Sequence, residues 1–277
     1  MGWELERALM PLGEVIAPSR TCERNLCGDL SDPAAVAATI REVAPHVIVN
    51  AAAYTNVDRA ESESKQAAAV NATAPGNLAA EAKSLGALLV HYSTDYVFDG
   101  RGDRAWQEDD PTGPLNIYGR TKLEGERAIQ ESGCRHLIFR TSWVYAARRE
   151  NFIRTMLRLT AERESLKVIN DQYGAPTGAE LIADTTALAV HQCQAQRRDY
   201  GLYHLAASGE ATWFTYAQHI IQAARGAGWP VRVSDDAIHP VGSDAFQSAA
   251  KRPKNSRLDT TRLESTFGLQ MPDWRIG

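Results

Sequence analysis

A tyrosine and a lysine four residues apart, Tyr118 and Lys122, are the residues whose types and spacing most directly suggest chemistry. On a helix, positions i and i+4 lie on one face, so the phenol and the ammonium would point the same way. A phenol has a pKa near ~10, and a neighbouring cation lowers this pKa by favouring the phenolate. The pair could therefore donate a proton to a substrate oxygen.

The segment before this pair supplies a hydroxyl group at the end of a strand. The apolar run 87–90 predicts a buried parallel strand that ends in Ser93, Thr94 and Asp95. From there, Thr94 could hold a substrate oxygen against the phenol. Tyr-x-x-x-Lys alone is also common on ordinary surface helices, but the preceding STDYVFDG segment favours catalysis.

Alternating strands and helices predict an α/β fold with a Rossmann-like, doubly wound parallel sheet and a smaller C-terminal substrate domain. The expected strands are 14–17, 46–50, 137–145, 166–169 and 201–205, and the expected helical regions are 60–85, 151–164, 179–194 and 213–224. We expect a dinucleotide-binding domain in 1–150 and about 178–206. The substrate domain would then comprise 151–177 and 207–277.

Composition indicates an ordinary globular protein. The chain has 277 residues, of which 44% are hydrophobic and 23% charged, and its formal charge of −4 predicts no nucleic-acid partner. No apolar run approaches the ~20 residues of a membrane span and no signal peptide opens the chain, so we expect no membrane partner and a cytoplasmic location. The cysteines form no C-x-x-C pair and are expected to be reduced thiols: Cys22, Cys27, Cys134 and Cys193.

Five sequence blocks, in order along almost the whole chain, resemble the dTDP-4-dehydrorhamnose reductase family of extended short-chain dehydrogenases/reductases. They are STDYVFDG, PLNIYGRTKLEGE, FRTSWVY, NDQYGAPTG and GLYHLAASGEATW. The resemblance implies NAD(P)H-dependent reduction of the C4 carbonyl of dTDP-4-dehydro-6-deoxy-L-mannose to dTDP-L-rhamnose, a precursor of cell-surface polysaccharide such as O-antigen. It implies that Tyr118 donates the proton, Lys122 holds the nicotinamide ribose, and Thr94 binds the reacting oxygen.

The resemblance also implies a set of residues that bind the cofactor along the strand ends, where open α/β sheets bind ligands. No acidic residue follows the expected strand 14–17 to bind a ribose 2′-hydroxyl, whereas Arg20 could face a 2′-phosphate, so NADPH is favoured over NADH. Asp29 could equally be a plain turn residue. The cofactor-binding candidates are Gly2, Arg20, Asp29, Leu30, Ala53, Tyr54, Thr55, Tyr92, Tyr118 and Lys122.

The two ends of the chain differ from the family pattern. Gly2 stands where the last glycine of the G-x-x-G-x-x-G loop belongs, and no first strand precedes it. No terminal helix follows 271–277. We therefore expect a chain clipped at both ends. The first strand is central in the order 3-2-1-4-5-6, so without it we expect a sheet with unpaired backbone groups, which cost ~1–3 kcal/mol each when buried.

Substrate and metal candidates come from the same resemblance. Trp143 could equally be a core residue. The basic cluster 251–257 could be a solvated run of charge, which is the commoner case, but a substrate with two phosphates needs a cationic partner and favours binding. The substrate-binding candidates are Thr94, Asp95, Trp143, Arg252 and Asn255. Glu4 and Glu180 match carboxylates that assist Mg²⁺-dependent dimerisation in relatives. We therefore expect a homodimer and give Mg²⁺ a minor place.

Two other functions remain open at this stage. A nucleotide-sugar epimerase or dehydratase would share the Tyr-x-x-x-Lys chemistry, although the NDQYGAPTG and FRTSWVY blocks argue against it. A non-catalytic regulatory subunit, like that of methionine adenosyltransferase, is compatible with the missing glycine loop. The complete set of Thr94, Tyr118 and Lys122 argues against that alternative.

Overall fold

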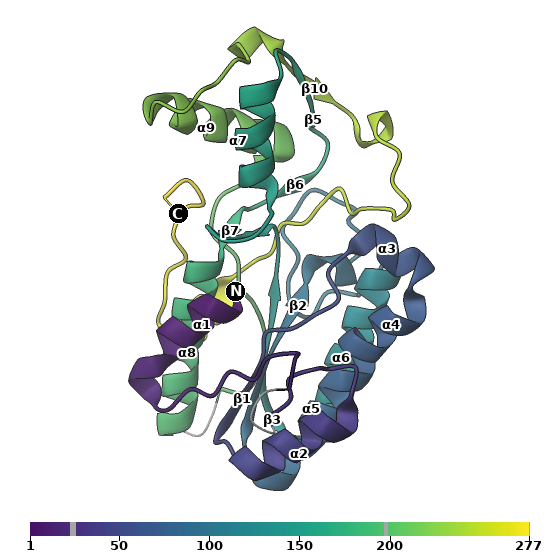
Figure 1. The fold of residues 1–277 in the computed structure, drawn as a ribbon, viewed down its shortest axis with the longest axis vertical. Helices are drawn as coiled ribbons and strands as arrows, with labels where there is room; N and C mark the ends of the chain where they lie inside the picture. Colours follow the sequence, from purple (N-terminus) through teal and green to yellow (C-terminus); the bar gives the residue numbers. More distant parts are fainter. Residues whose placement is uncertain (23–25, 197–198, 277) are drawn as a thin grey trace.

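A parallel four-stranded sheet forms the centre of the protein (Figure 1). The computed structural model describes residues 1–22, 26–196 and 199–276. The strand order is β1-β2-β3-β8, and every pairing within this sheet is parallel. The strands are β1 (Val47–Asn50), β2 (Leu88–Thr94), β3 (Arg135–Thr141) and β8 (Gly201–His204). This arrangement confirms the predicted α/β fold.

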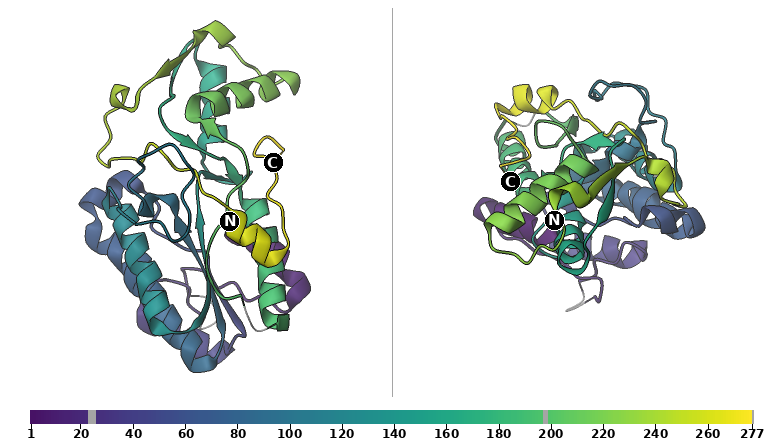
Figure 2. Two further views of the ribbon diagram at one scale, coloured as in Figure 1. Left: turned by 180° about the vertical axis from the view of Figure 1, so that it is seen from behind. Right: turned by 90° about the horizontal axis from the view of Figure 1, so that it is seen from above.

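Helices cover both faces of the sheet, because its strands are apolar on both sides (Figures 1 and 2). On β2, Leu88, Val90 and Tyr92 pack against one helical layer, whereas Leu89 packs against the other. The first layer comprises α1 (Gly2–Leu9), α8 (Ala179–Gln196) and α10 (Thr261–Phe267). The second comprises α2 (Pro33–Val43), α5 (Ala74–Leu85) and α6 (Ile117–Ser132).

A smaller lobe lies beyond the carboxyl ends of the sheet strands and has its own hydrophobic cluster (Figure 2). It contains α7 (Phe152–Glu162), α9 (Trp213–Gly226) and the parallel pair β5 (Leu166–Ile169) and β10 (Ile238–Val241). Two short strand pairs join it to the sheet: β4 (Val144–Tyr145) pairs with β7 (Thr177–Gly178), and β6 (Tyr173–Gly174) with β9 (Ala211–Thr212). The proposed domain boundaries stay a prediction, and α10 packs into the core of the sheet.

Two expected elements differ from the structure. Residues 14–17 form no strand, because none of the described residues pairs with them and a strand needs a hydrogen-bonded neighbour. The expected helical region 60–85 is interrupted. It consists of α3 (Val57–Ser62), α4 (Ser64–Ala68), a π-helical turn (Ala69–Thr73) and α5. Among the described residues, no helix is long and apolar enough to cross a bilayer.

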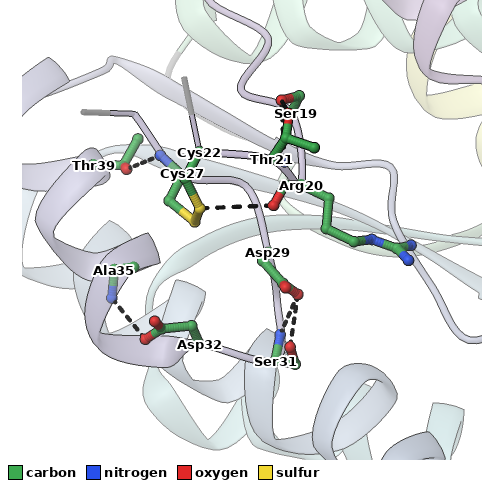
Figure 3. The surroundings of a disulfide bond; sticks show 10 residues. All are labelled: Ser19, Arg20, Thr21, Cys22, Cys27, Asp29, Ser31, Asp32, Ala35 and Thr39. Atoms are coloured by element: carbon green, nitrogen blue, oxygen red, sulfur yellow. Dashed lines mark hydrogen bonds between the residues drawn. A yellow bond between two sulfur atoms is a disulfide. The ribbon is translucent and has the colours of Figure 1, made fainter. Parts of the chain in front are cut away.

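The expectation of four reduced cysteines is wrong for one pair. Cys22 and Cys27 form a disulfide (Figure 3). The chain reverses direction around them: the Gly28 N–H donates to the Ser19 carbonyl over 2.9 Å, and the two cysteine Cα atoms lie 4.0 Å apart. The sequence does not predict this proximity, because the two cysteines fit no recognised motif. The other two cysteines are free and buried: Cys134 and Cys193.

Candidate active site

The start of α6 brings Tyr118 to the end of β2. Asn116 caps this helix by accepting the Gly119 N–H over 2.8 Å. A Cβ atom at Gly119 would lie 2.2 Å from the Tyr96 carbonyl oxygen, so only glycine lets the helix approach the turn after β2 this closely. The capped helix and the strand end thereby place Tyr118 beside Thr94.

Thr94 and Tyr118 meet as predicted. The Thr94 hydroxyl accepts the Tyr96 N–H over 3.2 Å and donates to Asp95 Oδ1 over 3.1 Å. Burial raises the pKa of Tyr118 to about 12, while a hydrogen bond with Thr94 opposes the rise. The Tyr96 ring lies edge-on to the Tyr118 ring, with 5.6 Å between centroids. At neutral pH, Tyr118 is therefore a neutral phenol that holds its proton.

Lys122 does not act on Tyr118 as expected. Its side chain is buried, and its Nζ donates to the Tyr92 carbonyl over 2.5 Å and lies 3.2 Å from His91 Nε2. Burial lowers the pKa of Lys122 to about 8, although Glu126 acts in the opposite direction. The prediction that Lys122 lowers the pKa of Tyr118 is wrong for this structure. The reason is that the lysine is directed into the sheet.

Asp95 is a buried carboxyl group beside these residues. Burial raises its pKa to about 7, against hydrogen bonds from Ser256 and Thr94. Among the described residues, its Oδ2 atom has no hydrogen-bond partner. Three other buried hydroxyl oxygens at the ends of β2 and β3 share this property: Ser93 Oγ, Thr141 Oγ1 and Ser142 Oγ. Buried polar groups are usually paired, so this strand-end group is suited to a polar ligand.

The nucleotide candidates after β1 form an ordered loop. The Tyr54 N–H donates to Asn71 Oδ1 over 2.9 Å, and Asn71 Nδ2 donates to the Tyr54 carbonyl over 3.0 Å. Ala53 and Thr55 flank Tyr54 at the carboxyl end of β1. Tyr92 differs from the prediction, because its side chain lies in the core on the α8 side of the sheet, where its hydroxyl bonds to Thr186. A cofactor could reach only the backbone of Tyr92.

Three of the four remaining nucleotide candidates lie in the segment before α2. Arg20 is exposed in the loop before α2 (Figure 3). Asp29 accepts the N–H and the hydroxyl of Ser31 in a local turn, which lowers the pKa of Asp29. Leu30 packs beside the α2 and α5 cluster. Gly2 opens α1 on the other face of the sheet, with open space around it. The structure does not bring Gly2 together with the other candidates.

The other three substrate candidates each have different surroundings. Arg252 donates to Asp58 Oδ2 over 2.6 Å and lies close enough to Tyr96 to affect its pKa. The Trp143 ring stacks on Trp213, 3.7 Å away, with its backbone at φ 48°. The side-chain amide of Asn255 is hydrogen-bonded within the protein: Nδ2 donates to the Arg104 carbonyl and Oδ1 accepts from Arg257. The predicted contact of the Asn255 side chain with substrate therefore disagrees with the structure.

The two metal candidates lie on neighbouring helices, α1 and α8 (Figure 1). Glu4 is buried and accepts from Arg7 over 3.2 Å, whereas Glu180 is exposed. Within the described ranges, no three His, Cys, Asp or Glu residues are grouped so as to hold a metal ion. The Mg²⁺ site remains a prediction.

Sequence reasoning missed two buried polar pairs that α6 makes with the sheet. Lys122 meets His91 on β2, and one turn later Glu126 meets Arg140 on β3 over 2.7 Å. The alternation of side chains along the two strands could have revealed these pairs. His91 and Arg140 occupy positions where the alternation calls for apolar side chains facing α6.

The fold and the site together define a class of protein. The sheet is parallel and of the nucleotide-binding type, and a threonine at a strand end lies beside a helix that carries Tyr-x-x-x-Lys. This is the arrangement of an extended short-chain dehydrogenase/reductase.

Comparison with known proteins identifies the family. The profile of the RmlD substrate binding domain matches residues 1–277. The chain is 52% identical to the dTDP-4-dehydrorhamnose reductase of Escherichia coli K12 and 51% identical to that of Salmonella typhimurium, over 100% of this chain and 92% of each relative. The NADP complex of the Bacillus anthracis reductase superposes with a TM-score of 0.87 at 34% identity, covering 99% of this chain and 92% of that one. This chain belongs to the dTDP-4-dehydrorhamnose reductase family.

Proposed function

We propose that this chain reduces the C4 carbonyl of dTDP-4-dehydro-6-deoxy-L-mannose to give dTDP-L-rhamnose. The observation that carries the proposal is the contact between Thr94 and a neutral Tyr118 at the end of β2. Two of the residues named by family resemblance, Thr94 and Tyr118, thus lie together. Their arrangement occurs in a chain that matches curated reductases over its whole length.

The protein residues have separate roles in this reaction. NADPH, when bound, supplies the hydride. Tyr118 donates its phenolic proton to the oxygen at C4 as negative charge develops there. Its raised pKa keeps that proton in place at neutral pH until the oxygen becomes a stronger base. Thr94 holds the reacting oxygen, and for this its hydroxyl must turn from Asp95 Oδ1.

The cofactor fits the strand-end group of unpaired oxygens. Ser93, Thr141 and Ser142 each offer a buried hydroxyl without a partner among the described residues, at the carboxyl edge of the sheet, where doubly wound folds bind nucleotides. Lys122 and the loop of Tyr54 would hold the ribose side. NADPH is the favoured cofactor, because Arg20 could face a 2′-phosphate and a relative binds NADP.

The rest of the sugar nucleotide would meet the smaller lobe. Arg252 presents a guanidinium to a diphosphate, and Asp95 presents its unpaired Oδ2 to a sugar hydroxyl. Trp143 would offer its ring to the sugar. A homodimer, a Mg²⁺ ion at Glu4 and Glu180, and a cytoplasmic location belong to the same proposal.

Replacement of Tyr118 by phenylalanine tests this proposal. Tyr118→Phe keeps the ring and removes the proton, so kcat should fall by about 100-fold or more while substrate binding stays nearly intact. The matched control is Tyr145→Phe, which removes a phenol from another half-buried tyrosine, on β4. Undiminished turnover in Tyr118→Phe would refute the assignment of the proton donor.

Product analysis separates the rival functions. An epimerase or dehydratase would convert dTDP-sugars without net consumption of NADPH. A non-catalytic subunit would bind nucleotide without converting the sugar. The proposed reductase forms one dTDP-L-rhamnose for each NADPH oxidised.

A further inference from the structure

The amine of Lys122 lies in a small polar site between α6 and the sheet, which we call the seat. Lys122 and His91 are each only 1% exposed, and their nitrogens Nζ and Nε2 are 3.2 Å apart. His91 shares the α6 side of β2 with Leu89, which packs into the apolar cluster. On the neighbouring strand, Asn50 lies directly opposite His91 in register. The two strands thus contribute one side chain each to the seat.

Asn50 determines which ring nitrogen of His91 carries the proton. The Ala52 N–H donates to Asn50 Oδ1 over 3.2 Å, so Asn50 Nδ2 faces His91 Nδ1, at 3.1 Å. An amide NH₂ group can only donate, so Nδ1 must accept. The proton of the neutral imidazole therefore lies on Nε2, which faces Lys122.

The Nε2–H tautomer of His91 can form a hydrogen bond only with the neutral form of Lys122. An ammonium group has three donors and no acceptor, so it cannot receive the Nε2–H. A neutral amine can receive it with its lone pair and still donate to the Tyr92 carbonyl. We propose that His91, oriented by Asn50, is a positioning residue that seats Lys122 as the neutral amine at alkaline pH when no nucleotide is bound.

The charged groups around the seat are consistent with this form. Burial lowers the pKa of His91 well below its usual value, so the imidazole is neutral. Glu126 on α6 favours the ammonium, but its carboxylate is already paired with Arg140 of β3. Asn50 of β1 carries no charge. Burial is the larger influence and lowers the pKa of Lys122 to about 8.

At alkaline pH, nucleotide binding then requires proton uptake. This step rests on the proposed function, in which Lys122 donates hydrogen bonds to the nicotinamide ribose. Moving Nζ from the seat toward hydroxyl oxygens gives it acceptors, which favour the ammonium. Tyr118, one turn earlier on α6, holds its proton through a raised pKa and does not supply the one that is needed. The proton must come from solvent.

The tautomer can be measured without nucleotide. In the ¹⁵N-labelled full chain at about pH 9, NMR should show His91 protonated at Nε2 and unprotonated at Nδ1, with the resonance assigned by its loss in His91→Phe. An Nδ1–H tautomer would overturn the proposal whether or not the chain is a reductase. The matched control is His204→Phe, which removes another fully buried imidazole, on β8, and should leave the His91 signal unchanged.

Calorimetry of NADPH binding in buffers of different ionisation enthalpy tests the second step. For a lysine pKa of about 8, roughly nine-tenths of a proton should be taken up at about pH 9, with the half-point near pH 8. In His91→Phe that half-point should move up by about one pH unit, because one hydrogen bond to the neutral amine is lost. Asn50→Leu should shift it the same way, which covers the case of a poorly folded His91→Phe.

Binding without proton uptake, or a half-point unchanged in both variants, would overturn the proposal. If NADPH does not bind at all, the proposed function fails, whereas the tautomer measurement still judges the seat.

Discussion

Ionisation of the buried Asp95 carboxyl group lowers the free energy of unfolding of the protein at neutral pH. Its pKa is about 7 in the folded chain against 3.8 for a free carboxyl group. Between these values, the unfolded chain loses the proton while the folded chain keeps it. Stability contributed by Asp95 is therefore fully present below about pH 4 and is lost as the pH rises through about 7.

The size of this loss follows from the pKa difference of about 3. At about 1.4 kcal/mol for each pKa unit, the full loss is about 4 kcal/mol. Asp95→Asn removes the ionisation but places two amide hydrogens where Oδ2 has no partner, which costs ~1–2 kcal/mol. We therefore expect the variant to be more stable than the natural chain at pH 8 by about 2–3 kcal/mol, while its activity falls because Asp95 faces the substrate site.

Urea unfolding at several pH values from 5 to 8 measures this effect. The difference between variant and natural chain is the relevant quantity, because His91 and His204 add an opposite slope that cancels in it. This difference should grow as the pH rises. Asp99→Asn is the control, since Asp99 is half-buried and faces Arg101 over 3.7 Å. A difference that stays constant from pH 5 to 8 would refute the reasoning.

Two further substitutions test the structure and the cofactor choice. Glu126→Gln should lower the free energy of unfolding by ~3–5 kcal/mol, because it leaves the buried Arg140 charge without its partner; a loss below ~1 kcal/mol in urea titration would contradict this. Arg20→Ala should narrow the preference for NADPH over NADH, measured as the ratio of kcat/KM values, because it removes the cation expected to face the 2′-phosphate. An unchanged ratio would leave Arg20 without a role in cofactor choice.

The sequence was most informative where one local pattern decides the outcome. The apolar residues before Thr94 form a strand that ends there, and the spacing of Tyr118 and Lys122 belongs to a helix that begins at Ile117. Both elements follow from short-range rules, whereas the meeting of Thr94 and Tyr118 was implied by the family resemblance. The strand Leu166–Ile169 was likewise predicted with its observed bounds.

What could not be predicted depends on contacts between distant segments. Lys122 faces His91, 31 positions away, and Asn255 is held by the carbonyl of Arg104, 151 positions away. Residues 14–17 have the composition of a strand but no pairing partner among the described residues. In each case, local composition is compatible with several environments, and tertiary packing selects one.

The most direct test of the central claim is the reaction itself. The purified chain is mixed with dTDP-4-dehydro-6-deoxy-L-mannose and NADPH, and loss of NADPH absorbance is followed together with formation of dTDP-L-rhamnose. We expect equal amounts of NADPH consumed and dTDP-L-rhamnose formed. Binding of both compounds, with the keto sugar recovered unreduced, would contradict it.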